Sequence, residues 1–579
     1  MPMHSPSFRL QGLGVISVAI ALIACGTSPG TATAPTPAPL KAATGAPLQS
    51  CAALATQFRF DQTQVTSATP EAAGTLKLGA NPVPAHCLVK GRMHPRKGSD
   101  GRDYAIGFEM RLPQAWNGRF YYQGNGGLDG TVQPAQGALG GGPLTGALLQ
   151  GFAVISSDAG HTGAQTPFFG LEPQARLDYG YQAVAKLTPM AKGLIAAAYG
   201  KGPDRSYIGG CSNGGRHAMV AAARLGDQYD GYLVGAPGYR LPNAALAQLW
   251  GAQQWATIST PGATIPHPMN PSATLADLGS GFTPKERQLL SSAVLEQCDA
   301  LDGARDGMVQ ATQACQARFN LQKDVPTCQG ERNGQCLTVA QKQVVAAVFS
   351  GAKTATGQPI YASFPYDTGV SGANWATWKF VNALALDPLA VGAMFSVPPG
   401  RVDPLKEDVS TRWPLFSATD DSFRESGLSL MTPPGQDNPV NLGALRARGA
   451  KMVLFHGVSD AVFSAEDTRR WIERLDQAQD GKAADFARYF PVPGMNHCSG
   501  GPAADQFDLL TPLVQWVEQG VAPQAVPASV RGAGHTGSAN AELPKDWSAS
   551  RTRPLCAYPT VARYAGSGSL EDAASFSCR

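Results

Sequence analysis

A serine at position 212 stands in a Gly-x-Ser-x-Gly pattern, with Gly210 and Gly214 two residues away on either side. This pattern is typical of a nucleophile elbow, a strained turn between a strand and a helix where a larger side chain at either glycine would crowd its neighbours. Because the chain holds 66 glycines, the pattern alone can arise by chance. A strand-like segment, 206–209, precedes it and a helix-compatible segment, 213–225, follows, which favours the elbow.

A serine hydroxyl is a poor nucleophile at neutral pH and needs a nearby base, which a carboxylate in turn orients. In α/β-hydrolases the chain order of these residues is Ser, then Asp or Glu, then His. Asp460 follows a predicted strand at 452–456, and His497 lies in the loop after the next predicted strand at 489–492. We therefore predict a catalytic triad of Ser212, His497 and Asp460.

Other interpretations of these residues stay open. Asp460 could be an ordinary turn-forming residue, and His497 a histidine of a surface loop. Three further histidines are weaker candidates for the base, because packing or supporting roles fit their positions better: His161, His217 and His456.

The oxyanion that forms when a serine attacks a carbonyl needs preorganised N–H donors. In this fold one donor follows the nucleophile and another comes from the loop after an earlier strand. A predicted strand at 120–122 ends in the glycine-rich loop 124–127. The predicted donors are therefore the N–H groups of Asn213 and Gly127, and Gly126 is expected to line the substrate site. An ordinary hairpin turn is the alternative for this loop.

Eleven cysteines occur in the chain, and ten remain when Cys25 is set aside with the N-terminal segment. An even number in a chain marked for export predicts disulfides. Many connectivities are compatible with ten cysteines, and a zinc site is the alternative use, although no Cys-x-x-Cys spacing occurs. Pairing of neighbours leaves Cys211 and Cys498 as the long-range pair, which would place Ser212 beside His497. The neighbouring couples are Cys51–Cys87, Cys298–Cys315, Cys328–Cys336 and Cys556–Cys578.

The N-terminus has the composition of an export signal. Arg9 supplies a positive charge, residues 13–24 are almost wholly apolar, and the run ends in a sequence that resembles a bacterial lipobox at Cys25. We predict a signal peptide at 1–25, a flexible tether at 26–48 and a lipid on Cys25, with a plain signal peptide as the alternative. The protein is expected to be periplasmic and anchored to the outer membrane, or secreted.

The remaining chain divides by its pattern. At 579 residues it exceeds one compact domain. Strand and helix signals alternate at 49–242, including a long amphipathic helix at 177–199, and again at 441–579. The alternation breaks at 243–440, which indicates an inserted domain. The predicted fold is an α/β-hydrolase with a large lid. A net charge of +3 without long basic runs gives no reason to expect a nucleic-acid partner.

An acidic loop within the insertion could bind a hard cation. Carboxylates recur there at spacings of three and four residues, with glycines for tight turns, which suits oxygen ligation of calcium. The pattern is not that of an EF-hand. The alternative is an acidic surface loop in which Arg305 pairs with a carboxylate. The predicted ligands are the side chains of Asp299, Asp302 and Asp306 and the carbonyls of Ala304 and Met308.

These motifs together resemble the tannase and feruloyl esterase family of secreted serine esterases. The family's hallmark of Cys-Ser, Asp and His-Cys corresponds to Cys211-Ser212, Asp460 and His497-Cys498. The resemblance runs from about Cys51 to the C-terminus. It implies a lid over the active site that binds the acyl part of the substrate and holds calcium. Further matching segments are 157–161, 235–239, 456–460 and 493–501.

Within the family, the chain is most similar to a branch that hydrolyses mono(2-hydroxyethyl) terephthalate. The resemblance assigns three residues to the substrate pocket: Leu241, Trp378 and Phe463. That branch grips the substrate carboxylate with a lid arginine and closes a phenylalanine over the ring. Here 374–400 contains no arginine, which leaves Lys379, Phe395 or Arg401 as replacements. An aromatic or phenolic ester is therefore the predicted substrate, with the terephthalate monoester as the alternative.

The overall prediction is a monomeric carboxylic-ester hydrolase that works through an acyl-enzyme on a small-molecule aromatic ester. It would touch a membrane only through the N-terminal lipid. Two alternatives come from other classes: a non-catalytic lipoprotein that binds aromatic ligands, and an acyltransferase or peptidase on the same scaffold.

Overall fold

The computed structural model describes residues 41–138, 140–142, 146–433 and 442–579. The predicted signal peptide with Cys25, and the predicted tether up to residue 40, lie outside the described residues. The end of the predicted tether belongs to the folded domain, because β1 (Ala46–Pro47) pairs with β7 (Ala115–Trp116) and the Thr44 backbone N–H donates to Asp204 at 2.8 Å. Composition did not reveal this boundary, since strand pairing over two residues leaves no periodic signal.

A nine-stranded mixed sheet forms the centre of the catalytic domain, in the order β15-β14-β11-β10-β8-β9-β6-β5-β2. Six neighbouring strands, β15 to β9 in this order, run parallel, and the last three are antiparallel. The strands are β2 (Thr63–Glu71), β5 (His86–Lys97), β6 (Asp103–Pro113), β8 (Arg119–Gln123), β9 (Ala153–Ser157), β10 (Arg205–Cys211), β11 (Gly231–Gly235), β14 (Lys451–Gly457) and β15 (Ala487–Val492).

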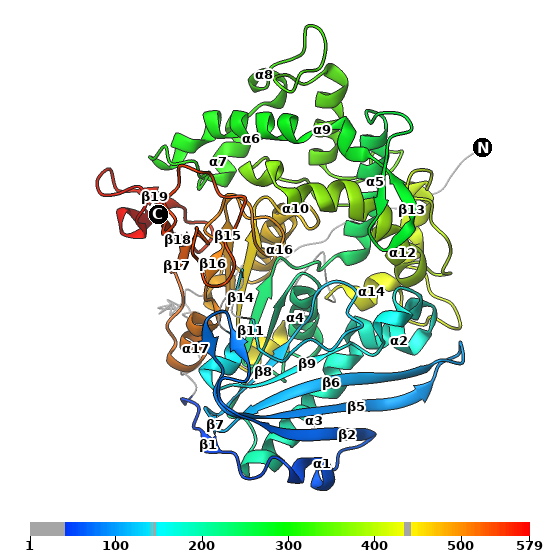
Figure 1. The fold of residues 1–579 in the computed structure, drawn as a ribbon, viewed down its shortest axis with the longest axis vertical. Coiled ribbons are helices and arrows are strands. Elements are labelled where there is room, and N and C mark those ends of the chain that lie inside the picture. The colour runs from blue at the N-terminus through cyan, green and yellow to red at the C-terminus, as the bar shows by residue number, and fades with distance from the viewer. Residues whose placement is uncertain (1–40, 139, 143–145, 434–441) are drawn as a thin grey trace, which may run out of the picture. The chain divides into compact units, whose positions relative to one another are not determined.

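Both faces of the parallel part are buried, which explains why its strands are continuous apolar runs in the sequence. Alternate residues point to opposite faces, so Tyr121 and Tyr207 pack in one core with α17, while Tyr122 and Ile208 pack in the other. The helices around the sheet are α1 (Ala53–Gln57), α2 (Pro173–Leu177), α3 (Ala183–Tyr199), α4 (Asn213–Arg224), α15 (Gly443–Ala447), α16 (Ala465–Ala478) and α17 (Leu510–Gln519). Figure 1 shows α3, α4 and α17 around the strands.

The segment predicted as the lid is mainly helical and lies near the carboxyl ends of the parallel strands (Figure 1). A small hairpin of β12 (Thr264–His267) and β13 (Asn270–Ala276) interrupts it. Its helices are α5 (Leu241–Ala256), α6 (Pro284–Cys298), α7 (Thr312–Arg318), α8 (Leu321–Asp324), α9 (Val339–Ser350), α10 (Ala373–Ala376), α11 (Ala383–Ala385), α12 (Asp387–Ala390), α13 (Val409–Arg412) and α14 (Gly427–Met431). A π-helical turn, η8 (Thr377–Asn382), follows α10 and carries Trp378.

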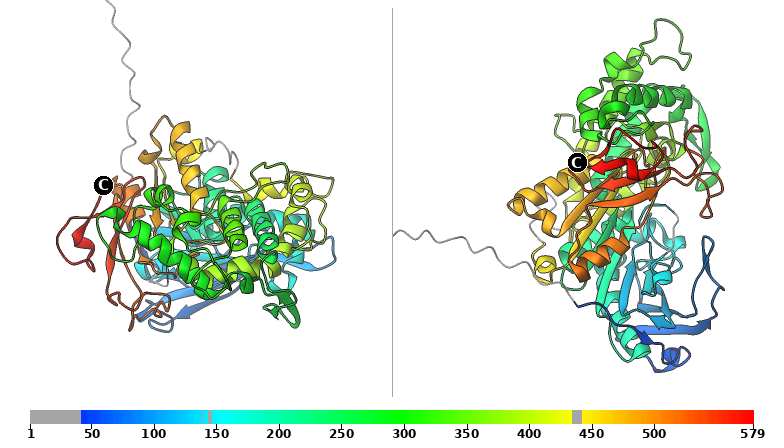
Figure 2. Two further views of the ribbon diagram at one scale, coloured as in Figure 1. Left: turned by 90° about the horizontal axis from the view of Figure 1, so that it is seen from above. Right: turned by 90° about the vertical axis from the view of Figure 1, so that its left-hand side faces the viewer.

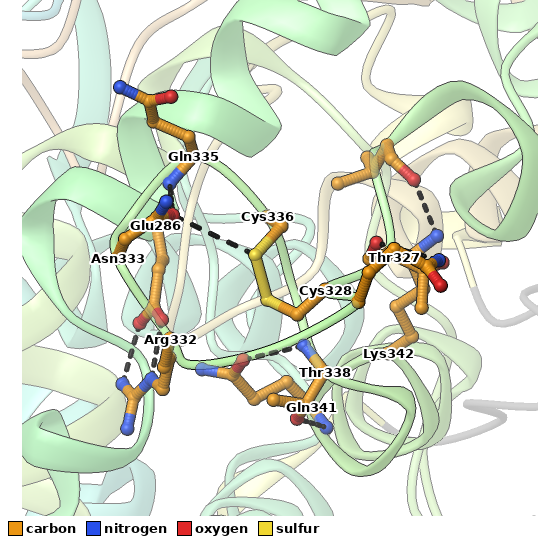
Figure 3. The surroundings of a disulfide bond; sticks show 12 residues. Glu286, Thr327, Cys328, Arg332, Asn333, Gln335, Cys336, Thr338, Gln341 and Lys342 are labelled. Carbon is orange, nitrogen blue, oxygen red and sulfur yellow. Dashed lines mark hydrogen bonds and ion pairs between the residues drawn. A yellow bond between two sulfur atoms is a disulfide. The ribbon is translucent and has the colours of Figure 1, made fainter.

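All five predicted disulfides are confirmed, and the zinc alternative is excluded because the ten cysteines are bonded to one another. Two of the bonds lie in the lid. Cys328–Cys336 closes a short loop that Arg332 ties to Glu286 at 2.6 Å, next to the start of α9, where Thr338 caps the helix (Figure 3). These local bonds stabilise a region of short elements that has little sheet to support it.

The C-terminal segment forms two small antiparallel sheets beside the lid helices (Figure 2). One consists of β16 (Gln506–Phe507), β17 (Ala525–Ser529) and β18 (Thr552–Cys556), and the other of β19 (Ala562–Tyr564) and β20 (Phe576–Cys578). The remaining strands, β3 (Lys77–Leu78) and β4 (Asn81–Pro82), pair with each other. In the described part of the chain, we find no helix with the length and apolar character needed to span a membrane.

Candidate active site

Ser212 occupies the turn between β10 and α4, as the elbow pattern predicts. Its φ of 65° and ψ of −126° lie where non-glycine residues are rare, so the surrounding structure must hold the turn. The Ser212 N–H donates to Gly235 O at 3.0 Å. A Cβ atom at Gly210 or at Gly214 would lie 2.3 Å from the carbonyl oxygen of Gly124 in either case. Both glycines are therefore required by the close approach of the neighbouring loop.

The three residues of the predicted triad meet at the carboxyl ends of the parallel strands. Ser212 Oγ lies 2.8 Å from His497 Nε2, and His497 Nδ1 lies 2.7 Å from Asp460 Oδ2. The second oxygen of Asp460 accepts from the N–H groups of Val462 and Phe463 at 2.9 and 3.0 Å. This geometry lets the hydroxyl donate to Nε2 while Nδ1–H donates to the carboxylate, which is the arrangement that activates a serine.

Asp460 is held as an anion although it is fully buried. Burial by itself would raise its pKa, but the His497 charge and hydrogen bonds from His456 and His497 lower the pKa well below its usual range. A buried carboxylate that keeps its charge can orient the imidazole and stabilise it when it becomes protonated.

His456 contacts the same carboxylate, a role that the sequence did not specify. It is buried at the end of β14, and its Nε2 lies 3.2 Å from Asp460 Oδ2 and 3.0 Å from Phe463 O. Since both partners only accept, Nε2 carries the proton, and Nδ1 pairs with Thr468 Oγ1 at 2.8 Å. The signal that could have found it is the spacing of four residues from His456 to Asp460 at a strand end.

The other two candidate histidines have partners other than Ser212. His161 is buried and stacks on Phe169, with ring centroids 3.5 Å apart. His217 lies in α4, and its Nε2 is 3.0 Å from Asp129. Neither histidine is placed to act as the base, as expected from the sequence, where both were weaker candidates.

The disulfide Cys211–Cys498 joins the residue before Ser212 to the residue after His497. It links positions 287 apart in sequence, with Cα atoms 6.0 Å apart. The covalent bond therefore fixes nucleophile and base side by side. The sequence predicted this bond, because pairing of neighbouring cysteines left Cys211 and Cys498 as the long-range pair.

The glycine-rich loop predicted to supply an oxyanion donor lies next to Ser212. A Cβ atom at Gly126 would be 3.8 Å from Ser212 Cβ, and Gly127 has a φ of 65°, which favours glycine. Asn125 anchors the loop by donating to Ser157 O at 2.8 Å. Asn213 is the first residue of α4, so its N–H has no acceptor within the helix and is available to a ligand.

Two of the predicted pocket residues stand edge-on to the base. The ring centroids of Trp378 and Phe463 lie 5.2 and 5.4 Å from that of His497, at interplanar angles of 79° and 75°. Leu241 is half-buried at the start of α5, three residues after Gly238, whose N–H approaches Ser212 O at 3.5 Å. Aromatic rings beside the imidazole suit a planar, apolar group on the substrate.

The expected replacements for a lid arginine do not serve that purpose. Lys379 is buried, which lowers its pKa to about 7, and its Nζ lies 3.6 Å above the Phe364 ring and 3.4 Å from Gln248 Oε1. Phe395 is buried within the lid, and Arg401 is exposed. Both Lys379 and Phe395 are buried rather than open to a ligand, because each lies on the buried face of its own π-helical turn, Lys379 in η8 and Phe395 in η9 (Val391–Phe395).

The carboxylates of the acidic loop accept hydrogen bonds from the backbone of the same loop. Asp299 accepts from the N–H groups of Asp306 and Gly307, and Asp302 Oδ1 accepts from Ala304 N–H at 2.9 Å. The second oxygen of Asp302 is buried and has no hydrogen-bond partner. Burial raises the pKa of Asp299, and that of Asp302 to about 7, with the charges of the neighbouring aspartates adding to the effect.

The loop fits a cation only in part. Asp306 pairs with Arg553 of β18, so a distant arginine, rather than Arg305, takes one carboxylate. Among the described residues, no three or more His, Cys, Asp or Glu side chains are grouped so that they could hold a metal ion. The unpartnered oxygen of Asp302 is the feature that favours a ligand, and the predicted carbonyl donors are those of Ala304 and Met308.

Residues 87–579 match the family model for tannase and feruloyl esterase. The chain belongs to this family. It is 38% identical over 547 residues to a mono(2-hydroxyethyl) terephthalate hydrolase of Piscinibacter sakaiensis, covering 87% of each chain, and 27% identical to a probable feruloyl esterase B-1 of Aspergillus fumigatus, covering 81% of this chain and 82% of that one. It is a carboxylic-ester hydrolase.

Solved structures bear out the fold. Feruloyl esterase B from Aspergillus oryzae superposes with a TM-score of 0.71 at 24% identity, over 91% of this chain and 99% of that chain. The tannin acyl hydrolase of Aspergillus niger gives a TM-score of 0.61 at 19% identity, over 90% and 92%. The predicted α/β-hydrolase fold with inserted helices is therefore confirmed.

Proposed function

We propose that the protein hydrolyses esters of aromatic or phenolic carboxylic acids through the triad Ser212, His497 and Asp460. The observation that carries the proposal is the continuous path from Ser212 Oγ to His497 Nε2 at 2.8 Å and from His497 Nδ1 to Asp460 at 2.7 Å. His497 takes the serine proton as the hydroxyl attacks the ester carbonyl. The N–H groups of Gly127 and Asn213 hold the oxyanion.

The remaining steps complete acylation and then release the acid with the same groups. His497 gives its proton to the departing alcohol, and the acyl group remains on Ser212. A water molecule then loses a proton to His497 and attacks the acyl carbon, which releases the carboxylic acid. Asp460 keeps its charge throughout and stabilises the imidazolium at both stages.

The aromatic nature of the substrate is inferred from the walls of the site. Trp378 and Phe463 both lie beside His497, so a ring on the acyl side could pack against them. Relatives named for feruloyl and terephthalate esters support this class. We propose the terephthalate monoester as a second substrate with weaker binding, because 374–400 offers no guanidinium for its free carboxylate.

Replacement of the nucleophile tests the proposal. Ser212→Ala should abolish hydrolysis of methyl ferulate, with an unchanged melting temperature, and should abolish covalent labelling by a fluorophosphonate. Turnover that survives in this variant refutes the assignment of Ser212 as the nucleophile.

Further measurements separate the alternative functions. A native protein that is folded but not labelled would favour the non-catalytic binding protein. Product analysis with an alcohol or amine present separates hydrolysis from acyl transfer and peptide cleavage, and a panel of methyl ferulate, methyl gallate and the terephthalate monoester ranks the substrates.

Export and a calcium ion complete the proposed picture. Five disulfides are typical of an exported protein. We propose lipidation at Cys25 from the lipobox-like sequence, and a monomeric state.

We also propose that the loop of Asp299, Asp302 and Asp306 binds calcium in a structural role. The buried oxygen of Asp302 that has no hydrogen-bond partner supports this proposal.

A further inference from the structure

The oxyanion hole is assembled from two separate parts of the chain. Gly127 belongs to the loop after β8, and Asn213 begins α4 after the elbow. Two N–H groups stabilise a developing charge only when both lie at hydrogen-bond distance from the same point. A displacement of about 1 Å between them can cost a factor of 10² in rate. The protein therefore needs a device that fixes the loop against the helix.

We propose that Asp129 and His217 are positioning residues that clamp the two halves of the oxyanion hole together, an inference that rests on the proposed function. Asp129 lies two residues after Gly127 in the loop, and its side chain is buried. One of its oxygens, Oδ2, lies 2.7 Å from Asn213 Nδ2 and 3.0 Å from His217 Nε2. A single carboxylate thus holds two side chains of the facing helix.

The spacing of the two partners explains why one oxygen can reach both. Asn213 and His217 are four residues apart in α4 and therefore lie on the same face of its first turn. Asp129 adopts a φ of 55°, which is uncommon for a residue with a side chain, and its N–H approaches Gly126 O at 3.4 Å. The tight turn directs the carboxylate from the loop to the helix.

A second series of hydrogen bonds also connects α4 to the loop of Gly127. Asn213 Oδ1 accepts from Arg216 Nε at 2.6 Å, and Arg216 donates to the carbonyls of Gly180 and Tyr179 at 2.8 and 2.9 Å. The hydroxyl of Tyr179 then donates to Gly127 O at 3.3 Å. Loop and helix are therefore connected twice, once through Asp129 and once through Arg216 and Tyr179.

The charges of the cluster are compatible with a nearby oxyanion. A lone buried anion would oppose the negative charge of the tetrahedral intermediate. Arg216 is buried in the same cluster, so the pair of Asp129 and Arg216 carries no net charge. Burial, together with the charge of Arg216, lowers the pKa of His217, so its imidazole is neutral and Nε2–H serves as a donor.

The cost of this arrangement supports a role beyond packing. Apolar side chains would fill the space between loop and helix without the penalty of desolvating a carboxylate and a guanidinium. A buried polar network with satisfied partners instead specifies one relative position of the two segments. That position is what the two N–H donors require.

Kinetics and inhibitor binding on the full chain test the proposal. In Asp129→Ala we expect kcat for methyl ferulate to fall about 10- to 100-fold with KM changed less than about 3-fold. Benzeneboronic acid forms a tetrahedral adduct with Ser212 and depends on the hole, so its affinity should fall in parallel. Affinity for ferulic acid, which needs no such adduct, should stay within about 3-fold.

Conservative and control variants separate positioning from folding. His217→Gln keeps an N–H donor and should retain most of the activity, whereas His217→Ala should lose about 10-fold in kcat. Asp129→Asn serves as the second variant if Asp129→Ala does not fold. The matched control is Asp230→Asn, which alters another buried aspartate, paired with Arg448 at 2.9 Å, and should leave kcat unchanged.

Two results would overturn the proposal. One is a folded Asp129→Ala enzyme with native kcat and native affinity for the boronic acid. The other is a fall of boronic-acid and ferulic-acid affinities by the same factor, which would indicate general damage to the pocket. Failure of the proposed function itself appears separately, as turnover or labelling that survives in Ser212→Ala.

Discussion

At the scale of single residues, the active site depends on buried carboxylates whose neighbours set their charge. Asp460 stays ionised because two histidines donate to it. Asp158, at the end of β9, has the opposite environment. Burial raises its pKa to about 7, the Asp129 charge adds to the rise, and hydrogen bonds from Gly160 and Gly107 only partly oppose it. Below about pH 7 the same residue type thus carries a different charge at two places in one domain.

This difference predicts a pH-dependent stability that belongs to Asp158. An unfolded aspartate has a pKa near 3.9. Between about pH 4 and 7 the folded protein holds a proton on Asp158 that the unfolded chain has lost, so the stability contribution is complete below pH 4 and is lost as the pH rises to about 7. Asp158→Asn should remove this loss, which we expect to be about 4 kcal/mol between pH 4 and 8.

Urea unfolding of both proteins across this pH range measures the effect. The difference in free energy of unfolding between native protein and variant should shift in favour of the variant as the pH rises. Asp204→Asn is the control, because hydrogen bonds from Lys201 and Thr44 offset burial and lower its pKa. A pH-independent difference for Asp158→Asn contradicts the prediction.

At the scale of elements, the site is assembled by two strand–loop junctions and one covalent bond. The elbow joins β10 to α4, the loop of His497 follows β15, and Cys211–Cys498 ties them together. The lid contributes Trp378 from a π-helical turn, a type of irregularity that is frequent at functional sites. Arg176 holds the lid to the catalytic domain by donating to Ser396 O at 3.2 Å and to Ala393 O at 2.8 Å.

Removal of the Cys211–Cys498 bond should affect both stability and catalysis. A disulfide that spans so long a segment typically contributes about 2–5 kcal/mol. We expect the double variant Cys211→Ser, Cys498→Ser to lose that much free energy of unfolding and to have a reduced kcat, because the serine and histidine loops separate. Chemical denaturation and methyl ferulate turnover are the measurements.

The matched control is Cys556→Ser with Cys578→Ser, which removes the bond between the two C-terminal sheets. That variant should lose stability with kcat preserved. An equal effect of the two double variants on kcat would mean that the bond beside the triad has no special role in aligning it.

At the scale of the whole molecule, the acidic loop is a junction between lid and C-terminal segment. Asp306 pairs with Arg553, Arg551 donates to Asp306 O at 2.6 Å, and Arg563 donates to Leu301 O at 3.1 Å. A cation bound by this loop would stabilise the contact of two parts of the chain that lie far apart in sequence. Removal of the cation should therefore weaken the contact between the lid and the C-terminal segment.

Chelation tests this role. EDTA should lower the melting temperature by several degrees, and added calcium should restore it, since an ion that binds only the folded protein stabilises it by mass action. Asp302→Asn should abolish the response to both. An Asp277→Asn variant, altered at a helix cap elsewhere in the lid, should still respond. A melting temperature that ignores EDTA and calcium in the native protein contradicts the calcium proposal.

Sequence reasoning was strongest where chemistry demands fixed residue types at fixed places. The elbow glycines, the strand ends before Asp460 and His497, and the four couples of neighbouring cysteines are local patterns, and the structure has each of them. It failed where the outcome depends on contacts between distant segments. Lys379 was expected to face a ligand but lies inside the lid, and the pairing of Asp306 with Arg553 crosses 247 positions.

The extra strands were missed for a related physical reason. The edge strand β2 is half-exposed and lacks a clean alternation, and the C-terminal sheets are built from segments of two to five residues. Asp129 gave no signal either, because a lone aspartate in a loop is usually a turn residue. Its role emerges only when the fold brings α4 against that loop.

The bond between Cys211 and Cys498 also determines what a protease can do to this enzyme. In the sequence, Ser212 comes before the insertion and His497 comes after it. One cut anywhere between these two residues leaves two polypeptides. The disulfide keeps these fragments joined, and the shared sheet pairs β11 of one with β14 of the other when the cut falls in the insertion. A clipped form would thus persist as a two-chain protein, and after reduction its halves would be held only by non-covalent contacts.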